Sequence, residues 1–380
     1  MAKTDSPPYL RLSLIFLSIS LLSLFFQLLL NRFDELNPAP HPPEALSRVL
    51  VPVRKHFDRI VEATERIGDG LVDGPEDFAY DAESGVVYTS CADGWIRRVK
   101  VGDSVVGPAV EEWVRVGGRP LGLALRPDKR AVLVAEAYKG LMQVTMEGHI
   151  ELLTDEAEGV KFKIVDGIDV AEDGIIYFTD ASYKYSLHDY SLDILEGRPY
   201  GRLLSFNPST NQTRVLLRDL YFANGVSLSP EQDFFVFCET FVRRCRKYYI
   251  KGEKKGMVEK FVENLPGYPD NVRYAEGLLW IGSPSGQNLF YDTLFRYPLL
   301  RKIMGIVGKF YQASNLETES GIMAVNLDGE VVARYSDPGL GQVTGGLRIG
   351  NYLYYGSLSA PYIGRLKLNQ EGAPVSTAAA

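Results

Sequence analysis

The pattern of hydrophobic and polar positions divides the chain into two unlike parts. Residues 12–30 form an apolar stretch without a charged residue. From about residue 70 onward, short apolar and aromatic runs alternate with turns rich in Gly, Asp, Asn and Pro, and helical periodicity nearly vanishes. Such runs are typical of β-strands joined by tight turns. The pattern therefore predicts an apolar N-terminal helix followed by an all-β body.

The apolar stretch has the length of a transmembrane helix, because at about 1.5 Å per residue it just spans a hydrocarbon core. A cleaved signal peptide is the alternative, with a shorter apolar region and a small-residue cleavage site behind it. The segment behind this stretch instead carries Arg32, Asp34 and Glu35. We expect residues 1–31 to be a cytosolic tail and membrane anchor, whereas a cleaved peptide would leave a soluble vacuolar or secreted protein.

The charges that flank the stretch predict its orientation. Lys3 and Arg11 precede it, whereas Arg32 is offset by its acidic neighbours. The positive-inside rule then gives a single-pass type II protein, with the body in the lumen of the secretory pathway, such as the endoplasmic reticulum or vacuole. Asn211 opens a glycosylation sequon, which is consistent with a lumenal body. We expect residues 32–57, which include a Pro-rich run, to be a stiff linker between membrane and body.

A unit of about four strands recurs along the body. Its copies begin at Gly74, Gly118, Val165, Ala223, Tyr268 and Val343. Six such units predict a six-bladed β-propeller over residues 58–370, because radial repetition leaves few exposed strand edges. The last unit is one strand short, and we expect Asp58 to Ile67 to supply that strand. An irregular β-sandwich is the alternative, but it does not repeat one motif six times. Residues 371–380 are expected to be a disordered tail.

One segment interrupts the fifth unit. Residues 291–312 are long, apolar and basic. We expect a helix that Pro298 ends or kinks and that caps one face of the ring. A membrane-touching surface is a second interpretation, since Arg296, Arg301, Lys302 and Lys309 lie beside Leu, Ile and Phe residues. The two interpretations are compatible.

Polar residues open several units at equivalent positions. The first strand of each propeller blade lines the central channel, and that position yields Glu76, Asp77, Asp166, Asn224, Asp270 and Asn271. Carboxylates brought together in a desolvated channel repel each other, so one of them holds its proton or they share a cation. Carboxylate and amide oxygens suit a hard, flexible cation such as calcium. Asp and Asn residues that merely begin tight turns are the alternative.

Composition excludes several classes of function. The net charge is -7 and the pI is ≈ 5.4, without a basic cluster, which argues against a nucleic-acid partner. The chain lacks a phosphate-binding or dinucleotide motif, so we expect no nucleotide cofactor. Its cysteines lack zinc-ligand spacing. Cys238 and Cys245 flank a predicted hairpin turn, which leaves both a disulfide and two unpaired strand residues open, and Cys91 is expected in the core.

Several sequence blocks resemble the calcium-dependent propeller hydrolases, which comprise paraoxonases, gluconolactonases and senescence-marker-type lactonases. The resemblance extends over most of residues 60–368. It is closest to the strictosidine-synthase-like branch of plants and to its membrane-anchored animal cousin, the adipocyte plasma-membrane-associated protein. The blocks that carry it are GPEDF from Gly74, YFANGVSLSP from Tyr221 and YPDNVRY from Tyr268, supported by GRPLGL, DEAEGVKFK, YFTDAS, GRLLSFNP and LYYGSL.

This resemblance implies a metal site and a base. Glu76, Asn224 and Asp270 match the metal-ligand positions of the lactonases, and Asn271 matches an additional paraoxonase ligand. Asp166 stands where those enzymes usually carry Asn, so it would tighten calcium binding or serve as a base. In such enzymes calcium polarises an ester or lactone carbonyl. An adjacent carboxylate, most plausibly Asp270, activates water or attacks directly.

Two catalytic features of the resembling proteins match less well. Paraoxonases use histidines over the metal, and here only His188 lies in a loop that could overhang the channel, with a surface position as the alternative. Strictosidine synthase uses a glutamate of its last blade, without metal. That position falls on or near Thr344, whose hydroxyl cannot act as an acid or base at neutral pH. Strictosidine synthase chemistry is therefore not expected.

Together these features predict a calcium-dependent hydrolase of esters or lactones, of the arylesterase or lactonase type, with a small-molecule substrate. The first alternative is a non-catalytic binding propeller in which the ion is structural. The second is a condensing enzyme of specialised, alkaloid-type metabolism.

Overall fold

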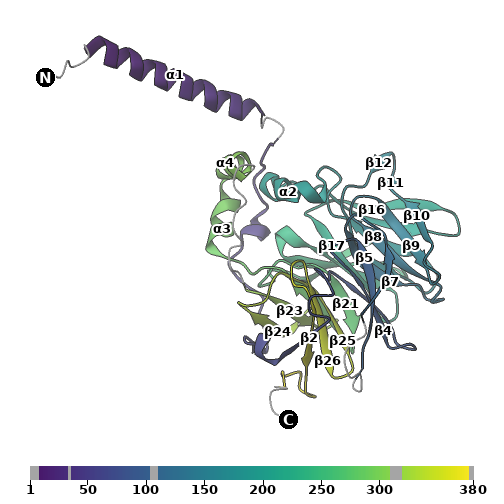
Figure 1. The fold of residues 1–380 in the computed structure, drawn as a ribbon. Coiled ribbons are helices and arrows are strands. Elements are labelled where there is room, and N and C mark those ends of the chain that lie inside the picture. Colours follow the sequence, from purple (N-terminus) through teal and green to yellow (C-terminus); the bar gives the residue numbers. More distant parts are fainter. Residues whose placement is uncertain (1–7, 33–35, 103–109, 309–318, 376–380) are drawn as a thin grey trace.

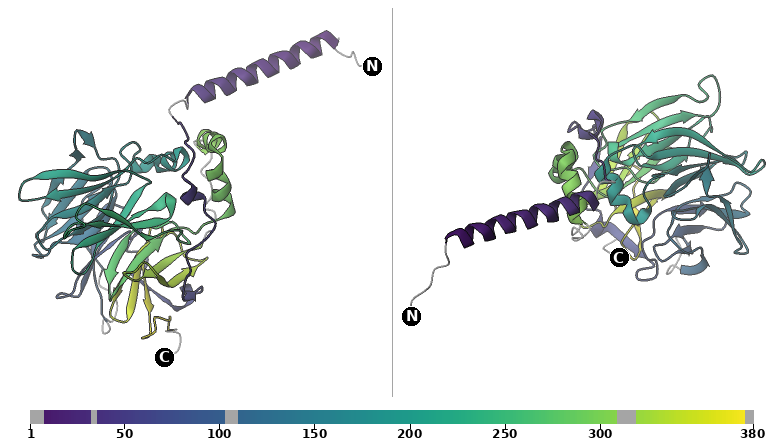
Figure 2. Two further views of the ribbon diagram at one scale, coloured as in Figure 1. Left: turned by 180° about the vertical axis from the view of Figure 1, so that it is seen from behind. Right: turned by 90° about the horizontal axis from the view of Figure 1, so that it is seen from above.

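The computed structural model describes residues 8–32, 36–102, 110–308 and 319–375. Most of the body is antiparallel strand, and Figures 1 and 2 show the sheets fanned around a shared centre. This is the all-β, propeller-type fold that the repeated units predict.

Four sheets of four strands are consecutive in the chain. Their strands are β3 (Phe78–Asp81), β4 (Val86–Ser90), β5 (Trp95–Lys100) and β6 (Val110–Arg115); β7 (Pro120–Leu125), β8 (Ala131–Glu136), β9 (Gly140–Thr145) and β10 (Ile150–Thr154); β13 (Val165–Val170), β14 (Ile176–Asp180), β15 (Gly201–Asn207) and β16 (Gln212–Leu220); and β17 (Ala223–Leu228), β18 (Phe234–Glu239), β19 (Arg244–Tyr249) and β20 (Val258–Val262). A small hairpin, β11 (Glu156–Ala157) and β12 (Val160–Lys161), lies between the second and third sheets.

The last two blades are joined into one nine-stranded sheet. Its strands are β21 (Val272–Ala275), β22 (Leu278–Ser283), β23 (Ser320–Val325), β24 (Val331–Asp337), β25 (Val343–Ile349), β26 (Tyr352–Ser357) and β27 (Ile363–Lys367), with β1 (His56–Phe57) and β2 (Thr64–Ile67) at its two edges. The blades join because the end of β22 pairs with the start of β25, Ser283 opposite Val343.

The innermost strands form a closed ring. Each of β3, β7, β13, β17, β21 and β25 contacts the next, and β25 contacts β3. The ring is completed by the N-terminal segment, since β2 pairs antiparallel with β27 and thus serves as the outer strand of the last blade. The prediction that Asp58 to Ile67 closes the ring is confirmed, although only Thr64–Ile67 is strand and Val61–Ala63 forms the 3-10 helix η2.

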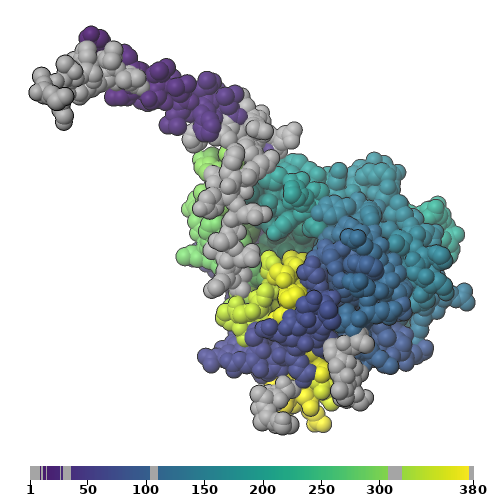
Figure 3. Space-filling view, in the orientation of Figure 1, coloured from purple at the N-terminus to yellow at the C-terminus, as the bar shows by residue number. Residues whose placement is uncertain are grey.

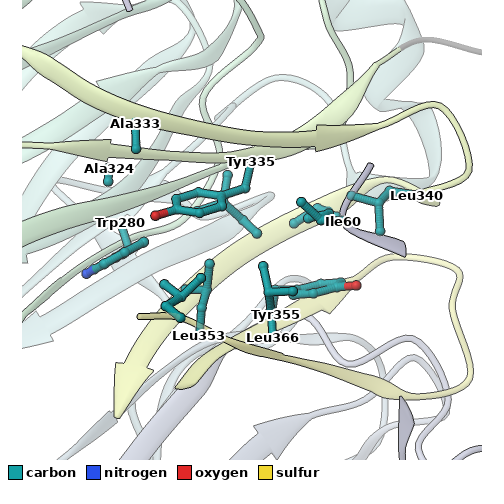
Figure 4. Packing of buried hydrophobic residues seen from close by; sticks show 12 residues of the cluster. Ile60, Trp280, Ala324, Ala333, Tyr335, Leu340, Leu353, Tyr355 and Leu366 are labelled. Atoms are coloured by element: carbon teal, nitrogen blue, oxygen red, sulfur yellow. The ribbon is translucent and has the colours of Figure 1, made fainter. Parts of the chain in front are cut away.

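Apolar side chains from the chain's two ends meet at this closure. One buried cluster combines Ile60 with Trp280 and Tyr335 of the fifth blade and Leu353 and Leu366 of the sixth (Figure 4). Burying these side chains removes apolar surface from water and holds the two ends of the ring together.

Helices and an N-terminal segment cover one end of the ring. The helices are α2 (Tyr190–Glu196) and η3 (Leu187–Asp189) after β14, η4 (Thr240–Val242) after β18, α3 (Leu289–Arg296) and α4 (Pro298–Gly308) after β22, and η1 (Pro43–Leu46). We call residues 36–48 the N-terminal strap. The strap runs between α2 and α4, where Ala39 donates its backbone N–H to the Glu196 carbonyl (2.9 Å) and Arg301 bonds the Ala39 carbonyl.

Two expectations about these segments change. The strap is not a spacer held apart from the body, because Leu36, His41 and Ala45 are buried. The expected cap helix is a pair, and Pro298 begins its second helix, where a missing N–H costs nothing. Residues 309–312 of the expected cap, 376–380 of the expected tail and 1–7 of the expected cytosolic tail lie outside the described residues.

The apolar stretch forms helix α1 (Pro8–Arg32), which stands away from the body (Figure 3). Over the described residues, no helix meets the combined length and apolarity of a membrane-spanning segment, so the predicted transmembrane helix is not supported.

Cys238 and Cys245 face each other on β18 and β19 and form a disulfide. The question that the hairpin spacing left open is thus answered by the register of these two strands. Cys91 is a buried free thiol in the core, as expected.

Candidate metal centre

Polar residues stand at the inner ends of four blades because of where each innermost strand begins. Glu76 lies two residues before β3, Asp166 and Asn224 are the second residues of β13 and β17, and Asp270 and Asn271 directly precede β21. Backbone hydrogen bonds fix these starting points. For example, Glu76 donates its N–H to the Ser90 carbonyl, and Asp270 donates to the Gly282 carbonyl, both at 2.9 Å.

Glycines next to these polar residues let the inner strands approach closely. A Cβ on Gly167 would lie 2.5 Å from the Asn224 carbonyl oxygen, and one on Gly225 would lie 2.5 Å from the Val272 nitrogen. Any side chain there would push neighbouring blades apart. The Asp-Gly and Asn-Gly pairs therefore bring the polar side chains of adjacent blades into one small space.

Three carboxylates meet in that space. Oxygen atoms of Glu76, Asp166 and Asp270 all lie within 4.8 Å of one another. The residues are buried, with exposed fractions of 2%, 4% and 7% respectively. Ionised carboxylates at this separation and depth repel strongly unless a proton or a cation is shared among them.

Amide side chains complete the group with oxygen atoms that have no partner. Asn271 donates from Nδ2 to Glu76 Oε1 (2.5 Å), and the side chain of Asn224 hydrogen-bonds Asp270. Among the described residues, Glu76 Oε2, Asn224 Oδ1 and Asn271 Oδ1 are buried acceptors without a hydrogen-bond donor. Each such orphan costs roughly 1–3 kcal/mol. A bound cation would satisfy all three, and an all-oxygen set of acids and amides fits calcium better than zinc.

The pKa values of the carboxyl groups in the ion-free site also favour a cation there. Burial, followed by repulsion from Asp270, Asp77 and Asp166, raises the pKa of Glu76 well above its usual value. Burial and repulsion from Asp270 and Asp77 do the same to the pKa of Asp166. The pKa of Asp270 rises to about 7, chiefly through burial. Without a cation, the site therefore retains protons that carboxyl groups in water lose.

Asp77, which the sequence also predicts as a metal ligand, is not among the three carboxylates that meet. Its carboxylate pairs with the Arg273 guanidinium, through Oδ1 to Nε (3.2 Å) and Oδ2 to Nη2, and Oδ2 also accepts the Leu123 N–H (2.8 Å). A carboxylate engaged by these donors has little capacity left for an ion.

Arg273 also ties together the inner strands of other blades. From β21, its Nη1 donates to the carbonyls of Ile168 on β13 (2.9 Å) and Val226 on β17 (3.3 Å), and its Nη2 donates to Leu123 on β7 (2.7 Å). With Asp77 at the entrance to β3, one guanidinium links five blades. This built-in cation holds the centre of the ring from within the protein.

A second arginine, Arg119, acts electrostatically on the three carboxylates. Arg119 donates from Nη1 to the Gly74 carbonyl (3.1 Å), two residues before Glu76, and its charge favours ionisation of Glu76, Asp166 and Asp270. Neither arginine is among the site residues predicted from the sequence. Arg273 had a signal, since strand alternation places it on the same face as Asn271; Arg119 had none.

Thr344 lies beside the group rather than in a separate site. It is buried on β25, donates its hydroxyl to the Glu76 carbonyl (2.6 Å), and its own carbonyl accepts the Asn271 N–H (2.9 Å). The hydroxyl therefore orients the segment that carries Glu76.

Two predicted residues lie at the surface. His188 is exposed in η3, and the structure does not bring it among the buried carboxylates. Asn211 is exposed in the turn between β15 and β16, with a positive φ of 52°, a conformation that Asn tolerates well.

The sequence is similar to characterised protein families. The family model described as strictosidine synthase matches residues 166–253, and the one described as strictosidine synthase-like, N-terminal, matches residues 62–99. Over 366 residues the chain is 49% identical to Protein STRICTOSIDINE SYNTHASE-LIKE 6 of Arabidopsis thaliana. This match covers 95% of this chain and 97% of the relative. It is 34% identical to the adipocyte plasma membrane-associated protein of Rattus norvegicus, over 80% of this chain and 86% of that one.

Solved structures share the fold. A gluconolactonase from Xanthomonas campestris matches with a TM-score of 0.57 and 16% identity, covering 84% of this chain and 98% of the other. A calcium-binding protein, regucalcin, from Agrobacterium tumefaciens matches with a TM-score of 0.57 and 15% identity, covering 86% and 97%. At such identities the likeness concerns the arrangement of the blades.

Calcium is expected to stabilise the protein more at high pH than at low pH. The ion-free pKa values of Glu76, Asp166 and Asp270 lie above those of unfolded carboxyl groups. Stability from these groups is therefore present below about pH 4 and lost as pH rises. Because calcium binds the ionised forms, it offsets this loss. Melting temperatures with calcium and with chelator, compared at about pH 5 and about pH 8, test this. An equal calcium effect at both pH values would contradict it.

Proposed function

The chain belongs to the strictosidine synthase-like family, and we propose that it is a calcium-dependent hydrolase of small esters or lactones. One observation carries the proposal: oxygen atoms of the buried carboxylates of Glu76, Asp166 and Asp270 lie within 4.8 Å of one another, and Glu76 and the neighbouring Asn224 and Asn271 each keep a buried oxygen without a hydrogen-bond donor. Among relatives of the same fold, one structure is described as a gluconolactonase and another as calcium-binding, which supports this class of chemistry.

The residues that would hold the ion are Glu76, Asp166, Asn224, Asp270 and Asn271, which offer carboxylate and amide oxygens. When bound, calcium would polarise the substrate carbonyl and stabilise negative charge on its oxygen. The narrow, desolvated setting strengthens such electrostatic effects.

Asp270 is the carboxylate best placed to act on water or on the substrate. It is the most exposed of the three, whereas Glu76 is held by Asn271. The Asn224 side chain hydrogen-bonds Asp270 and fixes its orientation. We assign Asp270 as general base or nucleophile and Asp166 as the second candidate.

The position of Arg119 favours a substrate whose hydrolysis gives a carboxylate product. Its side chain is half-buried, its Nη1 is anchored to Gly74, and its charge acts on the three carboxylates. Hydrolysis of an ester or lactone creates a carboxylate, for which a guanidinium is a suitable partner.

The variant Asp270→Asn tests whether Asp270 is the catalytic base or nucleophile. Asp270→Asn removes the base while it keeps the shape, and we expect hydrolysis of phenyl acetate and simple lactones to fall by about 10²–10⁴-fold. The exposed Asp173→Asn variant is the matched control and should retain wild-type rates. Circular dichroism verifies that both variants fold. Unchanged hydrolysis by a folded Asp270→Asn variant would refute the assignment.

The second candidate is a binding propeller in which the ion only supports the fold. Arg273 speaks against it, because the guanidinium already links five blades. The condensing-enzyme alternative has still less support, since by resemblance the position of the catalytic glutamate falls on or near Thr344, whose hydroxyl is bonded to the Glu76 carbonyl.

Chelation separates the catalytic ion from the structural one. We expect chelator to abolish hydrolysis while circular dichroism at 25 °C stays unchanged. Arg273→Met should instead lower the melting temperature, because loss of one partner of a buried ion pair typically costs about 3–5 kcal/mol. The double variant Arg273→Met, Asp77→Asn is the control and should recover part of that loss. Unfolding of the wild type by chelator alone would favour a structural ion.

We also propose that the body resides in an oxidising, glycosylating compartment. The Cys238–Cys245 disulfide supports this, because disulfides are rare where glutathione keeps thiols reduced. The exposed turn at Asn211 leaves its side chain accessible to a transferase.

Expression in eukaryotic cells tests this location. Endoglycosidase treatment should increase the electrophoretic mobility of the wild-type chain and leave Asn211→Gln unchanged. A wild-type chain whose mobility does not respond to the enzyme would contradict the proposal.

A further inference from the structure

Helix α3 turns an apolar face to solvent. Its exposed residues, Leu289, Phe290, Thr293, Arg296 and Tyr297, share one face, as the helical period requires. Three of them are large and apolar or aromatic, with exposed fractions of 70% for Leu289, 43% for Phe290 and 58% for Tyr297.

Helix α4 reverses the usual arrangement of a surface helix. Its outward residues are Leu299, Leu300 and Ile303, exposed by 70%, 38% and 44%. Its inward residue Arg301 is fully buried, donates to the Leu195 carbonyl (3.1 Å) and bonds the Ala39 carbonyl. A helix on a soluble surface normally buries its apolar side and exposes its charges. Apolar residues outside and a charge inside indicate a partner less polar than water.

The six outward side chains lie on two consecutive helices and on the residue that joins them, and we call this set the α3–α4 face: Leu289, Phe290, Tyr297, Leu299, Leu300 and Ile303. Exposed apolar clusters of this kind mark interaction sites, whereas single exposed side chains are ordinary.

The connection to α1 identifies the partner. Leu36 is buried against Gly305 of α4, where a Cβ would lie 2.4 Å from Leu36 Cδ2. Helix α1 ends at Arg32, and Leu36 follows four residues later in the chain. The C-terminal end of α1 is therefore tied close to α4. The large apolar side chains that the structure describes on α1, among them Leu12, Phe16, Leu22 and Leu28, are exposed, and Figures 1 and 2 show α1 leaving the body beside α4. Two exposed apolar elements therefore adjoin at one end of the molecule.

The charges that α3 and α4 themselves expose at the edge of the α3–α4 face are positive. Arg296 is exposed and Lys302 half-exposed at its edge. The acidic residue of α3, Asp292, has a side chain only 12% exposed that lies 3.6 Å from Arg48. Apolar side chains bordered by cations match the boundary between acyl chains and anionic headgroups.

We propose that the α3–α4 face docks onto an anionic lipid surface, with its apolar side chains entering the headgroup boundary. This inference is independent of the proposed hydrolase activity. A second copy of the chain and a protein partner are the competing occupants, and the positive border and the neighbouring α1 favour lipid over both.

A fluorescent probe on α4 tests the contact in the full chain. A polarity-sensitive dye is attached to Ile303→Cys, because the native cysteines are disulfide-bonded or buried and stay unlabelled. The matched control is Asp173→Cys. Asp173 is exposed in the turn before β14, whereas α2 and its neighbouring helices follow the C-terminal end of that strand. The control position therefore lies at the opposite end of the strand from these helices. The protein is mixed with vesicles of phosphatidylcholine and phosphatidylserine that carry a quenching acyl chain.

We expect the dye at position 303 to shift to the blue and lose most of its emission to the quencher, while the dye at position 173 changes little. Leu299→Glu in the labelled chain should abolish the quenching. Lys302→Gln should weaken binding to the anionic vesicles about five-fold. An unquenched dye at position 303 in vesicle-bound protein would overturn the proposal. So would a blue shift that needs no lipid and grows with protein concentration, which would assign the face to a second copy.

Discussion

Ring closure in this fold brings acidic groups together in a buried space. The innermost strands approach so closely that only glycine fits between them at positions such as Gly167 and Gly225, and acidic residues lie next to these close approaches. The resulting repulsion among buried carboxylates must be relieved by a retained proton or by positive charge. The architecture of the whole centre follows from how that charge is supplied.

Positive charge can come from two sources. The Arg273 guanidinium neutralises Asp77 and binds carbonyls of three further blades, so it belongs permanently to the fold. Glu76, Asp166 and Asp270 make no hydrogen bond to Arg273 among the described residues, and Glu76, Asn224 and Asn271 each keep a buried oxygen without a donor. Oxygens of this kind suit a cation from solution. Because Arg273 already links the blades, such a cation would be free to serve the proposed chemistry.

At the end of the ring that the helices cover, different residues serve the packing of the fold and the exposed surface. The strap, α2 and α4 pack on one another through buried groups such as Leu36 and Arg301, and thereby direct the apolar residues of α4 outward. This arrangement could not be read from the segment's composition, which is compatible with both a cap and a membrane-touching surface. Helical phase, set by the contacts of Arg301 with Leu195 and Ala39, decides which residues face the protein.

The repeated blades, the closing strand and the group of Glu76, Asp166, Asn224, Asp270 and Asn271 followed from the sequence alone, because strand periodicity and position within a repeat are local properties that recur along the chain. Tertiary structure decided what depends on atoms far apart in the chain. Asp77 and Glu76 are neighbours with the same pattern signal, yet their side chains turn to different partners, one to Arg273 and the other to Asn271. Both partners come from the fifth blade, about 195 residues further along the chain, so only the assembled ring decides which of them each carboxylate meets.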